Sequence, residues 1–209
     1  MMAHEINRRR FTALSVVAPF AAATGHGIGT TNAAEVGDNG LHVQPWFMET
    51  FLELASDKQE VEGAGKHLAV FFEQRGCPYC REMHTVNLER PEISDFIKTN
   101  FGVIQLDLFG SREVTDFDGE AMEERELARR WFVNFTPTIV LFPKGDVEQK
   151  RGPEIEVIRM PGYFKPFHFL TMFEYVREEA FSRIDFQRYL QEKADRLRAE
   201  GKPVEVWEN

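Results

Sequence analysis

The chain has 209 residues, 43% hydrophobic and 28% charged, a balance typical of a soluble globular protein with one sizeable core. Its net charge is -9 with no apparent basic patch, which argues against nucleic-acid binding because phosphates attract clustered Lys and Arg. With 19 Phe and only two Cys, the core is expected to rest on aromatic packing rather than on disulfides.

The N-terminal stretch has the pattern of an export signal. The basic run Arg8-Arg9-Arg10-Phe11 precedes an apolar segment, residues 12–23, which ends in small residues at Ala23. The Arg-Arg-x-Phe order resembles a twin-arginine signal, which implies a bacterial source and a periplasmic location; a general secretory signal or a disordered basic tail are the alternatives. We therefore expect residues 1–34 to be an export signal and linker start, and residues 35–44 to be linker.

The first half of the domain is expected to alternate helices and strands. Apolar spacing predicts a helix opened by Pro45-Trp46 and ending near Lys58, with Phe47, Phe51 and Leu54 on one face. The remaining elements are a loop at 60–66, a strand at 67–72, a helix at 78–88 with Met83 and Val86 inward, a short helix from Pro91, and a strand at 101–108.

The second half starts with a polar segment, residues 110–120, which we expect to be an insertion loop. The elements expected after it are a helix at 122–131, a strand at 139–142, a hairpin strand at 155–160, a helix through Phe169 and Ala180, and a last helix at 186–198. This order predicts an α/β fold, a central mixed sheet flanked by helices, with an antiparallel hairpin at one side. Residues 183–209 would form a C-terminal helical extension.

The only two cysteines, Cys77 and Cys80, are spaced C-x-x-C between a predicted strand and a predicted helix. If Pro78 is the first helical residue, Cys77 occupies the N-cap, where free backbone N–H groups and the helix dipole favour its thiolate. Cys77 is then the attacking sulfur, and Cys80 resolves the mixed disulfide. Arg75 and Arg81 flank the pair and would favour the thiolate further, unless they are solvated surface charges.

Two other interpretations of the cysteine pair compete with a redox function. A structural disulfide would close a very small ring and restrain few unfolded conformations. A metal site would use Cys77, Cys80 and His84, but a closed zinc site needs four ligands and the chain has no further Cys. We interpret His84 as a helix-surface residue near the site, and we expect no metal and no cofactor beyond the cysteine pair.

A second motif, Thr136-Pro137, precedes a predicted buried strand, and together with Cys77-Pro78-Tyr79-Cys80 it resembles the thioredoxin superfamily. The resemblance implies a thioredoxin-like domain over residues 45–182. It also implies a cis Pro137 and a substrate-binding surface made by Thr136, Pro137, Pro78 and Tyr79.

A closer resemblance is to the SoxW-type periplasmic thioredoxins. It rests on residues 72–84, on Gln105-Leu106-Asp107-Leu108 and on residues 110–119. It implies a periplasmic protein partner with a disulfide or thiol, such as a sulfur-oxidation carrier protein, and a membrane thiol-electron transporter as the reductant.

The chain departs from the usual thioredoxin pattern at a residue that serves in proton transfer. Thioredoxins usually have a buried Asp six residues before the first Cys, and here that residue is Phe71. Glu73 is the nearest upstream carboxylate and could take over the role, or be a surface residue at a strand end. The C-P-Y-C motif also resembles that of glutaredoxins, so the direction of electron flow stays open.

We therefore expect an exported thiol–disulfide oxidoreductase, more a reductase than an oxidant. The alternatives are a disulfide oxidase or isomerase of the same fold, or a non-catalytic binding module that uses residues 110–120 and the last helix.

Overall fold

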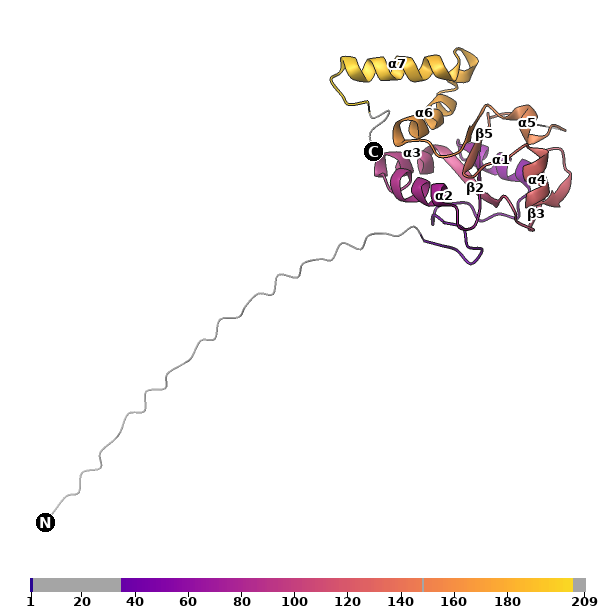
Figure 1. Cartoon of the computed structure of the whole chain (residues 1–209), viewed down its shortest axis with the longest axis horizontal. Helices are drawn as coiled ribbons and strands as arrows, with labels where there is room; N and C mark the ends of the chain where they lie inside the picture. Colours follow the sequence, from indigo (N-terminus) through magenta and orange to yellow (C-terminus); the bar gives the residue numbers. More distant parts are fainter. Residues whose placement is uncertain (2–34, 148, 205–209) are drawn as a thin grey trace. The chain divides into compact units, whose positions relative to one another are not determined.

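The computed structural model of the chain describes Met1 and residues 35–147 and 149–204 (Figure 1). The predicted export signal, apart from Met1, lies outside the described residues.

The described residues form helices on both sides of a small sheet. The helices are α1 (Leu54–Gly63), α2 (Pro78–Glu82), α3 (Pro91–Asn100), α4 (Glu124–Arg130), α5 (Gly152–Ile155), α6 (Pro166–Arg177) and α7 (Phe186–Ala199), with a π-helical turn η1 (Met83–Asn87) and a 3-10 turn η2 (Ala180–Ser182). The strands are β1 (His67–Glu73), β2 (Phe101–Asp107), β3 (Glu113–Thr115), β4 (Ala121–Glu123), β5 (Thr138–Leu141) and β6 (Ile158–Pro161). Within this described part, no helix has the length and apolar character needed to cross a membrane.

The main sheet has the strand order β2-β1-β5-β6. Strand β1 is parallel to β2 and antiparallel to β5, and β6 returns antiparallel to β5. All seven residues of β1 are buried, as expected for a central strand covered on both faces. The predicted α/β fold with a mixed central sheet and an antiparallel hairpin is therefore confirmed.

Successive side chains of β1 point to opposite faces of the sheet and supply two hydrophobic clusters. Leu68, Val70 and Phe72 pack in the cluster that includes residues of α1 and α4. Ala69 and Phe71 pack in the cluster that includes residues of α3 and α6. Glu73, the last strand residue, continues the second alternation, so its carboxylate is directed to the face that carries the cysteine helix.

The predicted helix from Pro45 is wrong, because this segment pairs with the sheet edge instead. The Met48 N–H donates to the Val103 carbonyl oxygen of β2, and the Gln105 side-chain amide donates to the His42 carbonyl oxygen, at 2.8 and 2.6 Å. Phe51, predicted to share a helix face with Leu54, is 97% exposed, whereas Leu54 is fully buried. The first helix is α1, which begins at Leu54 and continues through residues 60–63, where a loop was predicted.

The polar segment predicted as an insertion loop contains strand β3, which pairs with β4. Asp116 connects this hairpin to the rest of the domain by hydrogen bonds. Its fully buried carboxylate accepts hydrogen bonds from the Trp131 indole at 3.0 Å and from the Gly152 N–H at 3.2 Å. Burial raises the pKa of Asp116, and these hydrogen bonds act in the opposite direction. Val114 and Phe117 are buried with it. The hairpin is thus packed on the domain.

The C-terminal elements differ from expectation mainly at the predicted 155–160 strand. Ile155 ends the short helix α5, which Pro153 helps to start, so only Ile158–Pro161 pairs with β5. Helix α7 packs beside α6 (Figure 1). Its buried Lys193 donates to the Thr171 hydroxyl at 3.1 Å and to the Glu174 carboxylate.

Candidate active site

Cys77 and Cys80 form a disulfide at the start of α2, with their Cα atoms 5.2 Å apart. Gly76, with a positive φ of 70°, makes the turn that leads from β1 into the helix. Cys77 is the N-cap with extended backbone, and Pro78 is the first helical residue. The Cys80 N–H points at Cys77 Sγ at 3.0 Å. The sulfur of Cys77 therefore faces the free N–H groups of the helix start.

This placement favours the thiolate form of Cys77 once the disulfide is reduced, because N–H donors and the positive end of the helix dipole stabilise negative charge. Cys80 is fully buried, whereas Cys77 keeps 3% of its surface and is flanked by exposed Gly76 and Pro78. An incoming sulfur would therefore reach Cys77 before Cys80. Arg75 and Arg81 are both exposed, and the Arg75 guanidinium donates to the Asn39 carbonyl oxygen at 3.1 Å.

The loop before β5 meets the disulfide. The Thr136–Pro137 peptide bond is cis. The Thr136 hydroxyl and carbonyl oxygens lie 3.4 and 3.6 Å from Cys77 Sγ. Pro137 is buried and Thr136 half-buried. Two motifs 59 residues apart in the chain thus form one surface at the Cys77 sulfur.

Glu73 at the end of β1 and His84 in the turn η1 form a buried pair, and both residues are 0% exposed. His84 Nε2 is 3.0 and 3.2 Å from the two Glu73 carboxylate oxygens. The Gln105 amide donates to Glu73 Oε1 at 2.9 Å. With a proton on His84 Nε2, this nitrogen donates to the Glu73 carboxylate, as the Gln105 amide does.

The interpretation of His84 as a surface residue is therefore wrong. Cys80, Met83, His84 and Asn87 form the buried face of α2 and η1, and Val86, predicted to be inward, is 36% exposed. His84 can be buried because Glu73 on the neighbouring strand supplies its partner. A signal for the pair was present in the sequence: Glu73 ends an otherwise apolar run, and His84 follows Cys80 by one helical turn. In the part of the chain that the structure describes, no three His, Cys, Asp or Glu side chains are grouped to bind a metal.

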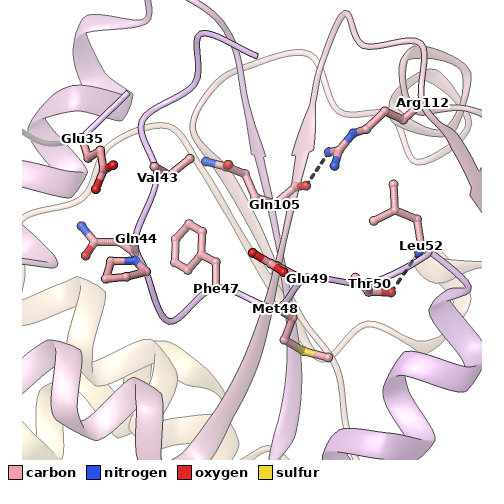
Figure 2. Close-up of a pocket in the computed structure, with 11 residues that line it drawn as sticks. Glu35, Val43, Gln44, Phe47, Met48, Glu49, Thr50, Leu52, Gln105 and Arg112 are labelled. Carbon is pink, nitrogen blue, oxygen red and sulfur yellow. Dashed lines mark hydrogen bonds between the residues drawn. The ribbon is translucent and has the colours of Figure 1, made fainter. Parts of the chain in front are cut away.

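The buried pair is connected to a cavity of about 480 Å³ on the β2 side. Gln44 lines this cavity, and its side-chain amide lies 3.3 Å from His84 Nδ1. Figure 2 shows Gln44 and Gln105 on the cavity wall, with Arg112 reaching the Gln105 carbonyl oxygen. A side-chain amide can donate or accept a hydrogen bond. By rotating about its last side-chain bond, Gln44 can therefore donate to His84 Nδ1 or accept from it.

A second cavity, of about 640 Å³, opens beside the disulfide. It is lined by Gln74, Tyr79, Asn134, Phe135, Thr136, Pro161, Gly162 and Tyr163. Two of the four residues predicted to bind substrate, Tyr79 and Thr136, thus lie on its wall. Pro78 and Pro137 are outside this lining, Pro78 being exposed beside the cysteines.

The sequence matches one family of known domains. Residues 54–177 match the family model described as thioredoxin-like domain. The solved structures that are similar include a thioredoxin-fold protein from Helicobacter pylori, with 24% identity, 62% of this chain and 85% of that chain covered, and a TM-score of 0.47. A thioredoxin from Thermus thermophilus has 27% identity, 58% and 82% coverage and a TM-score of 0.45. The oxidised C-terminal domain of DsbD from Neisseria meningitidis has 17% identity, 61% and 99% coverage and a TM-score of 0.39. No curated protein sequence gives a significant match.

Proposed function

This chain belongs to the thioredoxin-like family, and from that premise we propose that it is an exported thiol–disulfide oxidoreductase that reduces a disulfide of a periplasmic protein partner. The observation that carries the proposal is the Cys77–Cys80 disulfide at a helix N-cap, in contact with the cis Thr136–Pro137 loop. A disulfide serving only as a staple would not need a sulfur directed at helix N–H groups.

In the proposed reaction the reduced protein attacks through the Cys77 thiolate. A bond forms between Cys77 and one partner sulfur, and the other partner sulfur leaves as a thiolate. Thr136, Pro137, Pro78 and Tyr79 are the residues that would hold the partner during this step. The support for their role is their position around Cys77 Sγ and along the adjoining cavity.

Resolution then requires the Cys80 thiol to lose its proton and attack Cys77. The Cys77–Cys80 bond reforms, the mixed disulfide breaks, and two electrons have passed to the partner. We assign acceptance of the Cys80 proton to Glu73, with His84 as the residue that positions its carboxylate. Supporting this assignment, Glu73 and Cys80 are both fully buried and His84 lies one helical turn beyond Cys80.

The partner and the electron source are proposed from the resemblance to SoxW-type periplasmic thioredoxins. A sulfur-oxidation carrier protein would be the substrate, and a membrane thiol-electron transporter would reduce the disulfide again. No cofactor besides the cysteine pair enters this cycle. The predicted twin-arginine-like signal would bring the protein to the periplasm.

Substituting Cys80→Ala tests the mechanism. The variant keeps Cys77 but cannot resolve, so the mixed disulfide with the partner should accumulate in periplasmic extracts and disappear on treatment with dithiothreitol. The Cys77→Ser variant, which lacks the attacking sulfur, is the matched control and should trap nothing. Equal trapping by both variants, or by neither, would contradict the assignment.

A disulfide oxidase or isomerase of the same fold is the second candidate. It is favoured by the helix N–H groups around Cys77 Sγ, because stabilising the thiolate makes a disulfide more oxidising. A redox titration separates the two: a potential near about -270 mV fits a reductase, and one near about -120 mV fits an oxidant. A non-catalytic binding module would keep full biological function in Cys77→Ser.

A further inference from the structure

The proton of Cys80 and its proposed acceptor are both closed to solvent. Cys80, Glu73 and His84 are all 0% exposed. The resolving step of the proposed function moves the Cys80 proton to Glu73. Any exchange of this proton with water therefore has to pass through polar side chains that neighbour Glu73.

Gln105 contacts Glu73 and also lines the 480 Å³ cavity, but it is a poor proton carrier. Its amide nitrogen donates to Glu73 Oε1 at 2.9 Å and to the His42 carbonyl oxygen at 2.6 Å. Both hydrogens of the amide are thus used, and an amide nitrogen does not accept a proton. Gln105 holds the Glu73 carboxyl group in place without offering it a way out.

His84 has the chemistry that Gln105 lacks. Its Nε2 lies 3.0 Å from Glu73 Oε1, and its Nδ1 lies 3.3 Å from the Gln44 side-chain amide. An imidazole can take up a proton on one ring nitrogen and release one from the other. The ring therefore connects the buried carboxyl group to Gln44.

Gln44 stands between the outer nitrogen of His84 and the cavity. It is half-buried and lines the cavity together with the exposed Glu35 (Figure 2). The rings of His42 and Phe47 lie 5.7 and 5.8 Å from the His84 ring, between centroids, and cover it at other points. A rotation of the Gln44 side chain would thus be enough to bring water to Nδ1.

The orientation of the Gln44 amide corresponds to one particular protonation state of His84. The Gln44 atom that faces Nδ1 is the amide nitrogen, a donor, and a donor fits an unprotonated Nδ1. The ring proton is then on Nε2, which donates to Glu73. This arrangement belongs to the oxidised form, in which Cys77 and Cys80 are bonded.

Resting on the proposed function, we propose that His84 carries the Cys80 proton from Glu73 toward the cavity, and that Gln44 positions its outer nitrogen. In the reduced protein the ring proton is on Nδ1, and the Gln44 amide oxygen accepts from it. During resolution Glu73 takes the Cys80 proton and passes it to His84 Nε2, while Nδ1 releases its proton to water in the cavity. The electron pair of the Cys80 thiolate forms the bond to Cys77, and the partner sulfur leaves as a thiolate. Reduction of the disulfide reverses each proton transfer, so water returns a proton to Nδ1.

The first test reads the ring nitrogens of His84 by NMR. The protein is isotopically labelled at its histidine nitrogens, and the disulfide and dithiol forms are compared at the same pH, with His84→Gln to identify the His84 signals. Nδ1 should be unprotonated in the disulfide form and protonated in the dithiol form. His67 is the control, because it is also buried but lies at the other end of β1 from Glu73, and its nitrogens should not change.

The second test separates a proton path from a packing role of Gln44. The reduced protein is mixed with one equivalent of dithiobis(nitrobenzoate), so attack by Cys77 releases one coloured thiolate and resolution by Cys80 releases the other. In Gln44→Leu the second release should slow about tenfold or more, because an apolar side chain keeps water from Nδ1 and general acid–base assistance is typically worth about 10²–10⁴-fold. In Gln44→Ala a water molecule can replace the amide, so the second release should stay within about threefold of the wild-type rate.

A side chain that served only packing would give the opposite order, because alanine leaves the larger void. The matched controls are Gln59→Leu and Gln59→Ala, at an exposed position of α1, and both should keep the wild-type rate.

An Nδ1 with the same protonation in the disulfide and dithiol forms would overturn the inference while the proposed function stands. A second release in Gln44→Leu that is as fast as in Gln44→Ala, or faster, would overturn it as well. A wild-type protein that releases only the first thiolate would instead overturn the proposed function itself.

Discussion

Replacing His84 by leucine should destabilise the protein, because it leaves the buried Glu73 carboxylate without its partner. His84→Leu removes the donor that lies 3.0 and 3.2 Å from the Glu73 carboxylate oxygens. The carboxylate would then remain at 0% exposure with the Gln105 amide as its one remaining side-chain donor among the contacts described above. A buried charge left without its partner costs about 3–5 kcal/mol, a large share of a typical stability of about 5–15 kcal/mol.

The double variant Glu73→Gln/His84→Leu removes the charge together with its partner. The double variant should therefore lose less free energy of unfolding than the two single variants lose in sum, with a coupling energy of about 1–3 kcal/mol. The matched control is the exposed pair Lys98–Asp95, whose side chains are 41% and 70% exposed. The double-mutant cycle for this pair should give a coupling energy of about 0.2–1 kcal/mol.

The assay is urea unfolding at pH 7 followed by far-UV circular dichroism, under oxidising conditions that keep the Cys77–Cys80 bond intact. Each free energy of unfolding comes from the same extrapolation, so the values of the variants in the cycle can be compared directly. If the Glu73 and His84 losses add within about 0.5 kcal/mol, the two side chains do not act as a pair, and the positioning role assigned to His84 fails with it.

Two further predictions concern stability. Burial, with a smaller effect of Lys144, lowers the pKa of His67, so the folded protein keeps this imidazole neutral while the unfolded chain binds a proton below about pH 6.5. The free energy of unfolding should therefore fall as pH drops below about 6.5. In urea titrations, His67→Phe should reduce the dependence of this free energy on pH by at most about 1.4 kcal/mol per pH unit. An unchanged dependence in the variant would contradict the prediction. Gly152→Ala should cost about 1–3 kcal/mol because its Cβ would lie 2.2 Å from Trp131 Cζ2, whereas Gly63→Ala, with open space around it, should not destabilise; equal melting temperatures for the two variants would refute this.

The elements predicted correctly are those whose signals are local. The apolar run of β1 ends at a turn, and Pro78 marks the first residue of α2, so a strand followed by a helix could be read from about twenty neighbouring residues. The position of Cys77 at the N-cap follows from the same signal. The meeting of Thr136 with Cys77 is different, because no local pattern brings residues 59 apart together. That contact was expected only from the resemblance to a known fold.

The errors arise where a distant partner decides the structure. Phe47, Phe51 and Leu54 have the spacing of a helix face, yet Met48 donates to Val103 of β2 and the segment runs along the sheet. Burying a polar imidazole is costly without a hydrogen-bond partner, and Glu73 on the neighbouring strand supplies one to His84. The two cavities are assembled from several segments each, so neither could be derived from spacing along the chain.

The segment before α1 also matters for anyone who wishes to shorten this protein. A chain trimmed to residues 54–177, the part that matches the family model, would lack the residues around Met48 and His42 that cover the outer side of β2. Seven residues of mostly buried, apolar strand would then present unpaired N–H and C=O groups to other molecules, a template for intermolecular strand pairing. Crystallisation or expression of a shorter form should therefore retain the chain from residue 41 onward, even though those residues form neither helix nor strand.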